Sequence, residues 1–166
     1  MKKILVLFFV LGCIIHIYAQ HISFVGIPLG RSQEIVDRDL RKKGFKYIQE
    51  AYEPAHMYEG AFWIYPKVSV LARTHKKKVT EIIVHPMDSY SDPQLLIKHL
   101  NKKYGKYKSI EKTAILTSYN WSLLYGNVQV TIDRTKQYIS LRYIDNTSLY
   151  YYDMSSSNNR NKKNDL

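Results

Sequence analysis

Apolar and polar residues alternate along three segments in the second half of the chain. These segments, 119–125, 127–133 and 138–144, place an apolar side chain at nearly every second position. Strands that bury one face and expose the other show this period of two. Turn residues separate the segments, at Gly126-Asn127 and at Arg134-Thr135-Lys136, and they indicate hairpins. The pattern therefore predicts an antiparallel sheet.

Two other segments carry apolar residues at helical spacing. The first begins at Ser32 and stops at Gly44, and the second begins at Asp92-Pro93 and stops at Gly105. Ser and Asp are favoured N-caps, Pro suits the first turn of a helix, and Gly suits the residue that ends one. The apolar positions of the two predicted helices are Ile35, Val36, Leu40, Leu95, Leu96, Ile97, Leu100 and Tyr104.

Each predicted helix precedes a similar set of strands. The first helix is followed by 60–65, 67–73 and 78–85, and weaker strands are predicted at 45–52 and 110–117. An offset of 60 residues aligns apolar positions of the two halves, among them Val68 with Val128, Val70 with Val130, Val79 with Ile139 and Trp63 with Leu123. The sequence thus predicts an α+β fold of two tandem units, each with one helix packed on a three- to four-stranded antiparallel sheet. Two α+β units that match by coincidence are the alternative.

The first residues have the composition of a secretory signal peptide. Two lysines precede an apolar run at 4–15, and Ala19 offers a small residue for cleavage. The run is shorter than the roughly 20 apolar residues of a membrane span, so we expect a periplasmic or secreted protein with no transmembrane span in the mature chain. A lipoprotein anchored through Cys13 is the alternative. The expected division is a signal peptide at 1–19, a first unit at 20–88, a second unit at 89–152 and a disordered polar tail at 153–166.

Composition limits the chemistry. The chain has 166 residues with 25 Lys and Arg against 14 Asp and Glu, a formal net charge of +11, which favours anionic partners and surfaces. Its one Cys lies in the predicted signal peptide, so neither a disulfide framework nor a Cys-based metal site is expected after cleavage. Because an exported protein seldom meets nucleic acid, we expect no nucleic-acid partner.

Catalytic motifs are missing from the sequence. The histidines after the signal peptide do not form the His-Glu-x-x-His pattern of a zinc protease, and there is no Gly-x-Ser-x-Gly nucleophile motif. His75 and His85 could meet across a hairpin, but no third metal ligand lies near them in the sequence. We therefore expect a non-enzymatic protein with no metal and no cofactor.

Basic residues gather in short clusters. These are Arg41, Lys42 and Lys43 at the end of the first predicted helix, Lys76, Lys77 and Lys78 in a predicted turn, and Lys102 and Lys103 at the end of the second predicted helix. Solvated helix ends and a turn account for such clusters, because positive charge complements the C-terminal end of the helix dipole. The alternative is that the clusters bind an anionic glycan or lipid headgroups.

Strand alternation also predicts a binding face on the first sheet. Projecting the pattern of the second half by the offset of 60 makes Trp63 and Tyr65 core residues. The opposite face then carries an apolar patch with a basic rim, and such patches mark interaction sites. The predicted partner-binding residues are Phe62, Ile64, Leu71, Arg73 and Ile83. Coverage of this face by the tail, by 45–59 or by the other unit is the alternative.

The order of elements resembles a known family. Gly26-Ile-Pro-Leu-Gly30 leads into the first helix and Lys103-Tyr104-Gly105 ends the second. In these features residues 24–145 resemble the beta-lactamase inhibitor protein and small exported bacterial proteins with its fold. The resemblance implies tandem helix-plus-sheet units and a binding surface. It implies no target, because the mature chain lacks the disulfides of the inhibitor and matches none of its contact residues.

The function predicted from the sequence is therefore that of an exported, non-enzymatic binding protein. It would engage a protein partner in the cell envelope through a sheet face, and inhibition of an envelope enzyme is one way in which it could act. A basic module that binds anionic glycan or lipid headgroups is the alternative. A small hydrolase without a recognisable motif is the third interpretation.

Overall fold

A computed structural model describes residues 22–51, 55–87, 92–135 and 138–147. In chain order its elements are β1 (Ser23–Phe24), β2 (Ile27–Pro28), α2 (Gln33–Lys42), β3 (Lys46–Glu50), β4 (Ala55–Phe62), β5 (Tyr65–His75), β6 (Lys78–Pro86), α3 (Pro93–Tyr104), β7 (Ser109–Lys112), β8 (Leu116–Leu123), β9 (Gly126–Asp133) and β10 (Tyr138–Asp145). The predicted signal peptide with Cys13 and Ala19, and the predicted tail, lie outside the described residues. No helix in the described part of the chain is long and apolar enough to cross a membrane.

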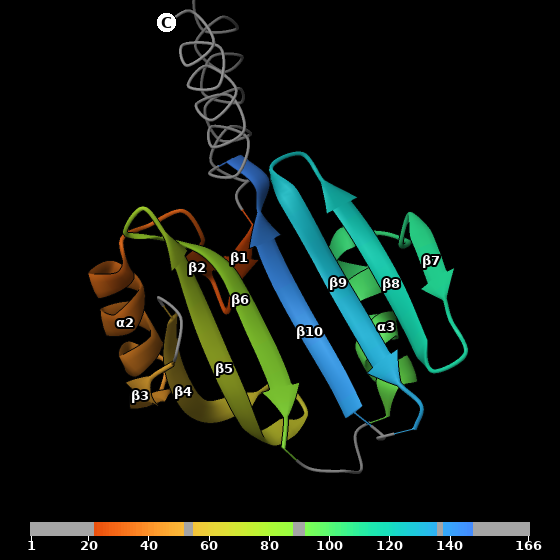
Figure 1. Ribbon diagram of the computed structural model, residues 1–166, viewed down its shortest axis with the longest axis horizontal. Helices are drawn as coiled ribbons and strands as arrows, with labels where there is room; N and C mark the ends of the chain where they lie inside the picture. The colour runs from red at the N-terminus through yellow and green to blue at the C-terminus, as the bar shows by residue number, and fades with distance from the viewer. Residues whose placement is uncertain (1–21, 52–54, 88–91, 136–137, 148–166) are drawn as a thin grey trace, which may run out of the picture.

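Eight of the strands form one antiparallel sheet in the order β3-β4-β5-β6-β10-β9-β8-β7 (Figure 1). The two halves of the chain meet at the pairing of β6 with β10, where Ile82 lies opposite Tyr143 and Ile83 opposite Arg142. The predicted fold of two tandem units, each a helix on its own sheet, is wrong. The described chain is mostly strand, with two helices on a single continuous sheet.

The helix boundaries follow the predicted capping residues. Ser32 is the N-cap of α2, although its side chain accepts no capping hydrogen bond. Asp92 caps α3 by accepting a hydrogen bond of 2.8 Å from the backbone N–H of Gln94. Gly44 and Gly105 follow the two helices with φ angles of 88° and 81°, which glycine adopts without the steric cost of a Cβ.

Both helices and the β1–β2 hairpin lie on the same side of the sheet (Figure 1). Phe24 of β1 is fully buried and joins the two halves, because its ring contacts Phe45 and Phe62 from the first half and Tyr143 from the second, with centroids 5.6, 5.2 and 5.5 Å away. The buried residues of α2, α3 and the sheet belong to one cluster. The protein therefore has a single hydrophobic core on one side of the sheet.

The β4–β5 hairpin departs from the predicted register. A β-bulge between Gly60 and Phe62 shifts the pairing by one residue, so that Phe62 lies opposite Tyr65 and Gly60 lies opposite Val68. Trp63, predicted to lie in the core, is in the two-residue turn between β4 and β5 and is 43% exposed, whereas Tyr65, also predicted to lie in the core, is 3% exposed.

Candidate functional site

The face of the sheet opposite the helices has no described element over it (Figure 1). Strand alternation assigns side chains to this outer face. On β5, for example, Val68, Val70 and Ala72 are fully buried toward the helices. The intervening Leu71 and Arg73 are half-buried and point the other way. The outer face therefore consists of the alternate residues of neighbouring strands, placed side by side by the strand register.

An apolar group lies at the centre of the first half of this face. Leu71 pairs with Met57 on one side and with Ile83 on the other, and Ile83 pairs in turn with Arg142 of β10. Leu71 and Met57 are half-buried, whereas Ile83 is only 7% exposed. Cross-strand neighbours on one face lie within side-chain contact distance. We call Met57, Leu71 and Ile83 the apolar centre of the outer face.

An ion-pair network borders the apolar centre and crosses the boundary between the two halves. The Glu81 carboxylate on β6 accepts a hydrogen bond of 3.1 Å from Arg73 Nη1 and one of 2.7 Å from Arg142 Nε. Arg142 Nη2 also donates to the same carboxylate. The Glu81 side chain is 12% exposed, so these charge-assisted bonds are partly shielded from water. The network holds three side chains in fixed positions on β5, β6 and β10.

Polar side chains cover the second half of the outer face and bond to one another. Gln129 Nε2 donates to Asn120 Oδ1 at 2.9 Å, and Asn120 Nδ2 donates to Glu111 Oε1 at 3.2 Å. The hydroxyls of Ser118 and Thr131 lie 3.0 Å apart. The outer face is thus apolar near β5 and hydrogen-bonding along β7, β8 and β9.

An aromatic pair lies on the same face, where β6 meets the start of β10. The rings of His85 and Tyr138 are 5.0 Å apart and tilted by 33°, and the Tyr138 hydroxyl lies 3.1 Å from His85 Nε2. Burial lowers the pKa of His85, which favours its neutral form. The sequence analysis did not predict this pair, because His85 and Tyr138 are 53 residues apart in the sequence.

The structure separates the five residues that the sequence predicted as a partner-binding patch. Leu71, Arg73 and Ile83 lie together on the outer face, as the register shows. Phe62 and Ile64 do not belong to it. Phe62 packs in the core against Phe24, and Ile64 lies in the β4–β5 turn with 44% exposure. Phe62 follows Tyr58 and Gly60 on the core side of β4, so the offset of 60 assigned the faces of this strand the wrong way round. Ile64 was misplaced because the predicted strand 60–65 includes the turn between β4 and β5.

The predicted basic clusters occupy separate places. Lys76 and Lys77 form the β5–β6 turn, and the backbone carbonyl of Lys77 accepts a hydrogen bond from Gln33 N at the start of α2. Arg41, Lys42 and Lys43 lie at the other end of that ten-residue helix, about 15 Å away at 1.5 Å per residue. Lys102 and Lys103 end α3, and Lys78 opens β6. The clusters at 41–43 and 76–77 lie at opposite ends of α2 and therefore do not merge into one anion-binding surface beside it.

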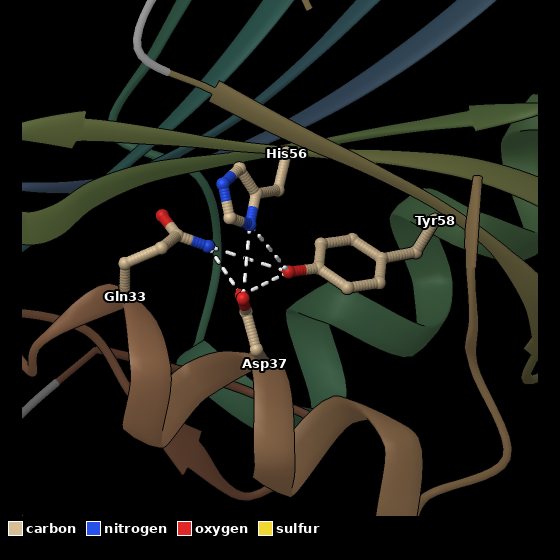
Figure 2. A network of polar contacts seen from close by, with 4 residues as sticks. All are labelled: Gln33, Asp37, His56 and Tyr58. Carbon is tan, nitrogen blue, oxygen red and sulfur yellow. Dashed lines mark hydrogen bonds and ion pairs between the residues drawn. The ribbon is translucent and has the colours of Figure 1, made fainter. Parts of the chain in front are cut away.

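A network of polar side chains joins α2 to the inner face of β4 (Figure 2). His56 Nδ1 lies 2.9 Å from Asp37 Oδ2, and the hydroxyl of Tyr58 donates to Asp37 Oδ1. Gln33 Nε2 also donates to Asp37 Oδ1 and lies 3.3 Å from the Tyr58 hydroxyl. The spacing explains the arrangement, because Gln33 and Asp37 are one helical turn apart and His56 and Tyr58 are alternate residues of a strand.

Burial sets the electrostatics of this network. Tyr58 is fully buried. Its pKa is raised well above 10.0, first by burial and then by its hydrogen bond to Asp37 and the negative charge of that carboxylate. The phenol therefore stays protonated and donates to Asp37. A carboxylate that orients a histidine is also found in general-base sites. Here both Asp37 oxygens are engaged by side chains of the network, which makes it a connection between helix and sheet.

In the described part of the chain, no group of three or more His, Cys, Asp or Glu side chains is placed to hold a metal ion. Comparisons with models of protein families, with curated proteins and with solved structures found no match. Nothing in them links the chain to the beta-lactamase inhibitor protein that its element order resembles.

Proposed function

We propose that this chain is an exported, non-enzymatic binding protein that docks a protein partner on the outer face of its sheet. The observation that carries the proposal is the apolar centre of Met57, Leu71 and Ile83 on a sheet face that no described element covers. Met57 and Leu71 are half-buried in this group, and Ile83 beside Leu71 is 7% exposed.

The composition of the face supports a protein partner. Protein interfaces combine an apolar centre with a polar rim that supplies hydrogen bonds. On this sheet the apolar centre borders the network of Glu81 with Arg73 and Arg142, and the amide ladder of Asn120 and Gln129 continues it. Side chains that already bond to one another lose little rotamer freedom on binding. The face is therefore preorganised for a large, flat partner.

Location and mode of action belong to the same proposal. The signal peptide expected at 1–19 would put the partner in the cell envelope, with anchoring of the chain through Cys13 as the alternative. Blocking an envelope enzyme is one way in which such a face can act, since a docked sheet covers a wide area of its partner.

The second candidate function is binding of anionic glycan or lipid headgroups through the basic clusters. The net charge of +11 favours it, whereas the separation of the clusters along α2 weakens it. Salt distinguishes the two candidates. Exposed charge pairs are screened at high salt, and apolar contacts are not.

The test is a pull-down from envelope extract at low and high salt, with bound proteins identified by mass spectrometry and the best candidate then purified and titrated. We expect one protein to bind at both salt concentrations and Leu71→Asp to abolish its binding. Leu124→Asp is the matched control, because Leu124 is 70% exposed in the β8–β9 turn, away from the outer face.

A second variant guards against misfolding of the first. Ser69→Arg adds bulk beside Leu71 on the outer face without removing an apolar contact, and we expect it to weaken binding of the same partner. Circular dichroism checks that each variant folds. Normal binding by both variants would contradict the proposal, and release of all bound material by salt would favour the anionic ligand.

A further inference from the structure

The β4–β5 turn presents a bulky aromatic residue in an unusual backbone conformation. Trp63 has a φ angle of 54°, in the left-handed region that bulky residues rarely adopt. Two-residue hairpin turns favour glycine or asparagine where φ is positive. Strained residues of this kind persist where the surrounding structure holds them, and they cluster at functional sites.

Helix α3 holds the Trp63 side chain in place. Its indole ring stacks on His99 with centroids 4.3 Å apart and planes inclined by 33°, and it meets Tyr65 edge-on at 6.3 Å. Despite these contacts Trp63 remains 43% exposed. A rigid indole is therefore presented to solvent at the end of the sheet where β4 turns into β5 (Figure 1).

Further exposed apolar side chains lie in the same turn and on the helix that carries His99. Ile64 follows it in the turn and is 44% exposed, and Leu95 lies one helical turn before His99 with 47% exposure. Met87, at 49% exposure, lies at the same end of the sheet, where its backbone N–H donates to the carbonyl of Lys67. We call Trp63, Ile64 and Leu95 the Trp63 patch.

Positive charge borders the patch. Lys102 and Lys103 follow His99 by three and four residues, on the same side of α3. The pKa of His99 is lowered, first by burial and then by these two lysines, which places their charges close to its ring. Helix α3 itself carries no acidic residue, and the Asp92 carboxylate, which caps the other end of the helix through Gln94 N, also acts on Tyr65.

We propose that the Trp63 patch inserts into the surface of an anionic phospholipid bilayer, with Lys102 and Lys103 against the headgroups. Tryptophan prefers the interface between headgroups and acyl chains, and apolar side chains of peripheral proteins enter to a shallow depth there. Lysines near an anionic membrane add attraction to it. This combination of indole, aliphatic side chains and lysines fits a membrane surface better than a soluble anion, which offers nothing for Ile64 and Leu95 to contact.

This surface is separate from the outer face of the sheet. The proposal therefore does not depend on the partner-binding function, and Leu71→Asp leaves it unchanged. Membrane attachment would instead orient the protein, holding the patch against the bilayer.

Tryptophan fluorescence tests the proposal directly. The sequence has two tryptophans, and Trp121 is 1% exposed, so a change in emission on adding vesicles reports Trp63. The chain from Gln20 onward retains every described residue and lacks the apolar signal segment, which would itself bind lipid. It is mixed with vesicles of phosphatidylcholine alone or with added phosphatidylglycerol, and binding is also measured by sedimentation.

We expect a blue shift and cosedimentation with phosphatidylglycerol vesicles, and quenching of the emission by brominated lipid. Trp63→Gly, which suits the positive φ, is expected to lower affinity by about tenfold or more. Replacing Lys102 and Lys103 with serine is expected to lower it for the anionic vesicles only. Leu124→Ser is the matched control for an exposed apolar residue and is expected to bind normally.

Three results would overturn the proposal. The first is unchanged vesicle binding by Trp63→Gly, and the second is equal binding to vesicles with and without phosphatidylglycerol. The third is a change in Trp63 emission with soluble polyphosphate but not with vesicles, which would assign the patch to a soluble anion.

Discussion

The imidazole of His56 and the carboxylate of Asp37 connect the first helix to the sheet, with Nδ1 and Oδ2 2.9 Å apart. Both side chains are mostly buried, at 25% and 20% exposure. Asp37 also accepts hydrogen bonds from Tyr58 and Gln33. A single carboxylate therefore accepts hydrogen bonds from three side chains, and removing it breaks all three bonds.

Replacing Asp37 with alanine is expected to lower the free energy of unfolding by about 2 kcal/mol, because buried donors are left unpaired. Asp39→Ala is the matched control. Asp39 has a similar side-chain exposure of 23%, but within the described part of the chain its carboxylate forms ion pairs only with the exposed Arg31 and Arg38, at 3.8 and 3.3 Å. Surface pairs of this kind contribute about 0–1 kcal/mol. Urea unfolding measures both variants, and equal losses would show that the network has no special role.

Two buried tyrosines are expected to respond oppositely to removal of the hydroxyl. Tyr65 is 3% exposed, and its hydroxyl has no hydrogen-bond partner among the described residues. Tyr65→Phe is therefore expected to raise the unfolding free energy by about 1 kcal/mol. Tyr58→Phe removes a donor to Asp37 and is expected to lower it by a similar amount. Thermal unfolding of the two variants decides the question, and destabilisation by Tyr65→Phe would mean that its hydroxyl is bonded in solution.

Stability is expected to fall at alkaline pH. Burial, with a smaller effect of the Asp92 charge, raises the pKa of Tyr65 from 10.0 to about 12, and burial also raises the pKa values of Tyr58 and Tyr143. Below pH 10 both folded and unfolded states keep these protons, so the stabilisation is fully present. Above that pH the unfolded state loses its protons first, and stability declines through the folded pKa values.

The expected slope is about 1.4 kcal/mol per pH unit for each such tyrosine. Urea titrations between pH 9 and the alkaline limit of folding would measure it. Tyr65→Phe is expected to reduce the slope of unfolding free energy against pH by the contribution of one tyrosine. A decline of the same slope in that variant would assign the effect to other groups.

The two halves of the chain are expected to unfold together. They share the β6–β10 pairing, the Glu81–Arg142 ion pair and the aromatic contacts of Phe24 with both halves. In a Trp63→Phe variant the fluorescence reports Trp121 in the second half, and far-ultraviolet circular dichroism reports the whole sheet. Coincident transitions are expected for one cooperative unit. Two separated midpoints would mean that each half is stable without the other.

Local signals predicted the secondary structure well. The helices α2 and α3 begin and end at the residues with capping character, from Ser32 to Gly44 and from Asp92 to Gly105. The regular alternation of the second half predicted β9 and β10 within a residue or two of their ends. Helix caps and the alternation of a strand depend on neighbours in the chain, and for that reason they can be inferred from the sequence.

The candidate sites were predicted less well. Leu71, Arg73 and Ile83 share a face because alternation along β5 and β6 is regular there. Phe62 was misplaced because the offset of 60 fails by one residue in β4, and Trp63 and Ile64 were misplaced because the turn falls at 63–64. In the second half Trp121 lies opposite Val128, whereas in the first half Gly60 lies opposite Val68. A Cβ at Gly60 would come within 2.5 Å of the Phe45 ring, so that ring occupies the space beside the glycine.

Composition and residues close in the chain were enough to predict the two helices, the strands β9 and β10, the repeated order of elements and the strongly basic charge. The pairing of β6 with β10, the contact of Asp37 with His56 and the stacking of Trp63 on His99 follow from the tertiary fold instead. These contacts join residues far apart in the sequence. They depend on which strand edges pair and on how side chains fill one shared core, and no local pattern of residues records either.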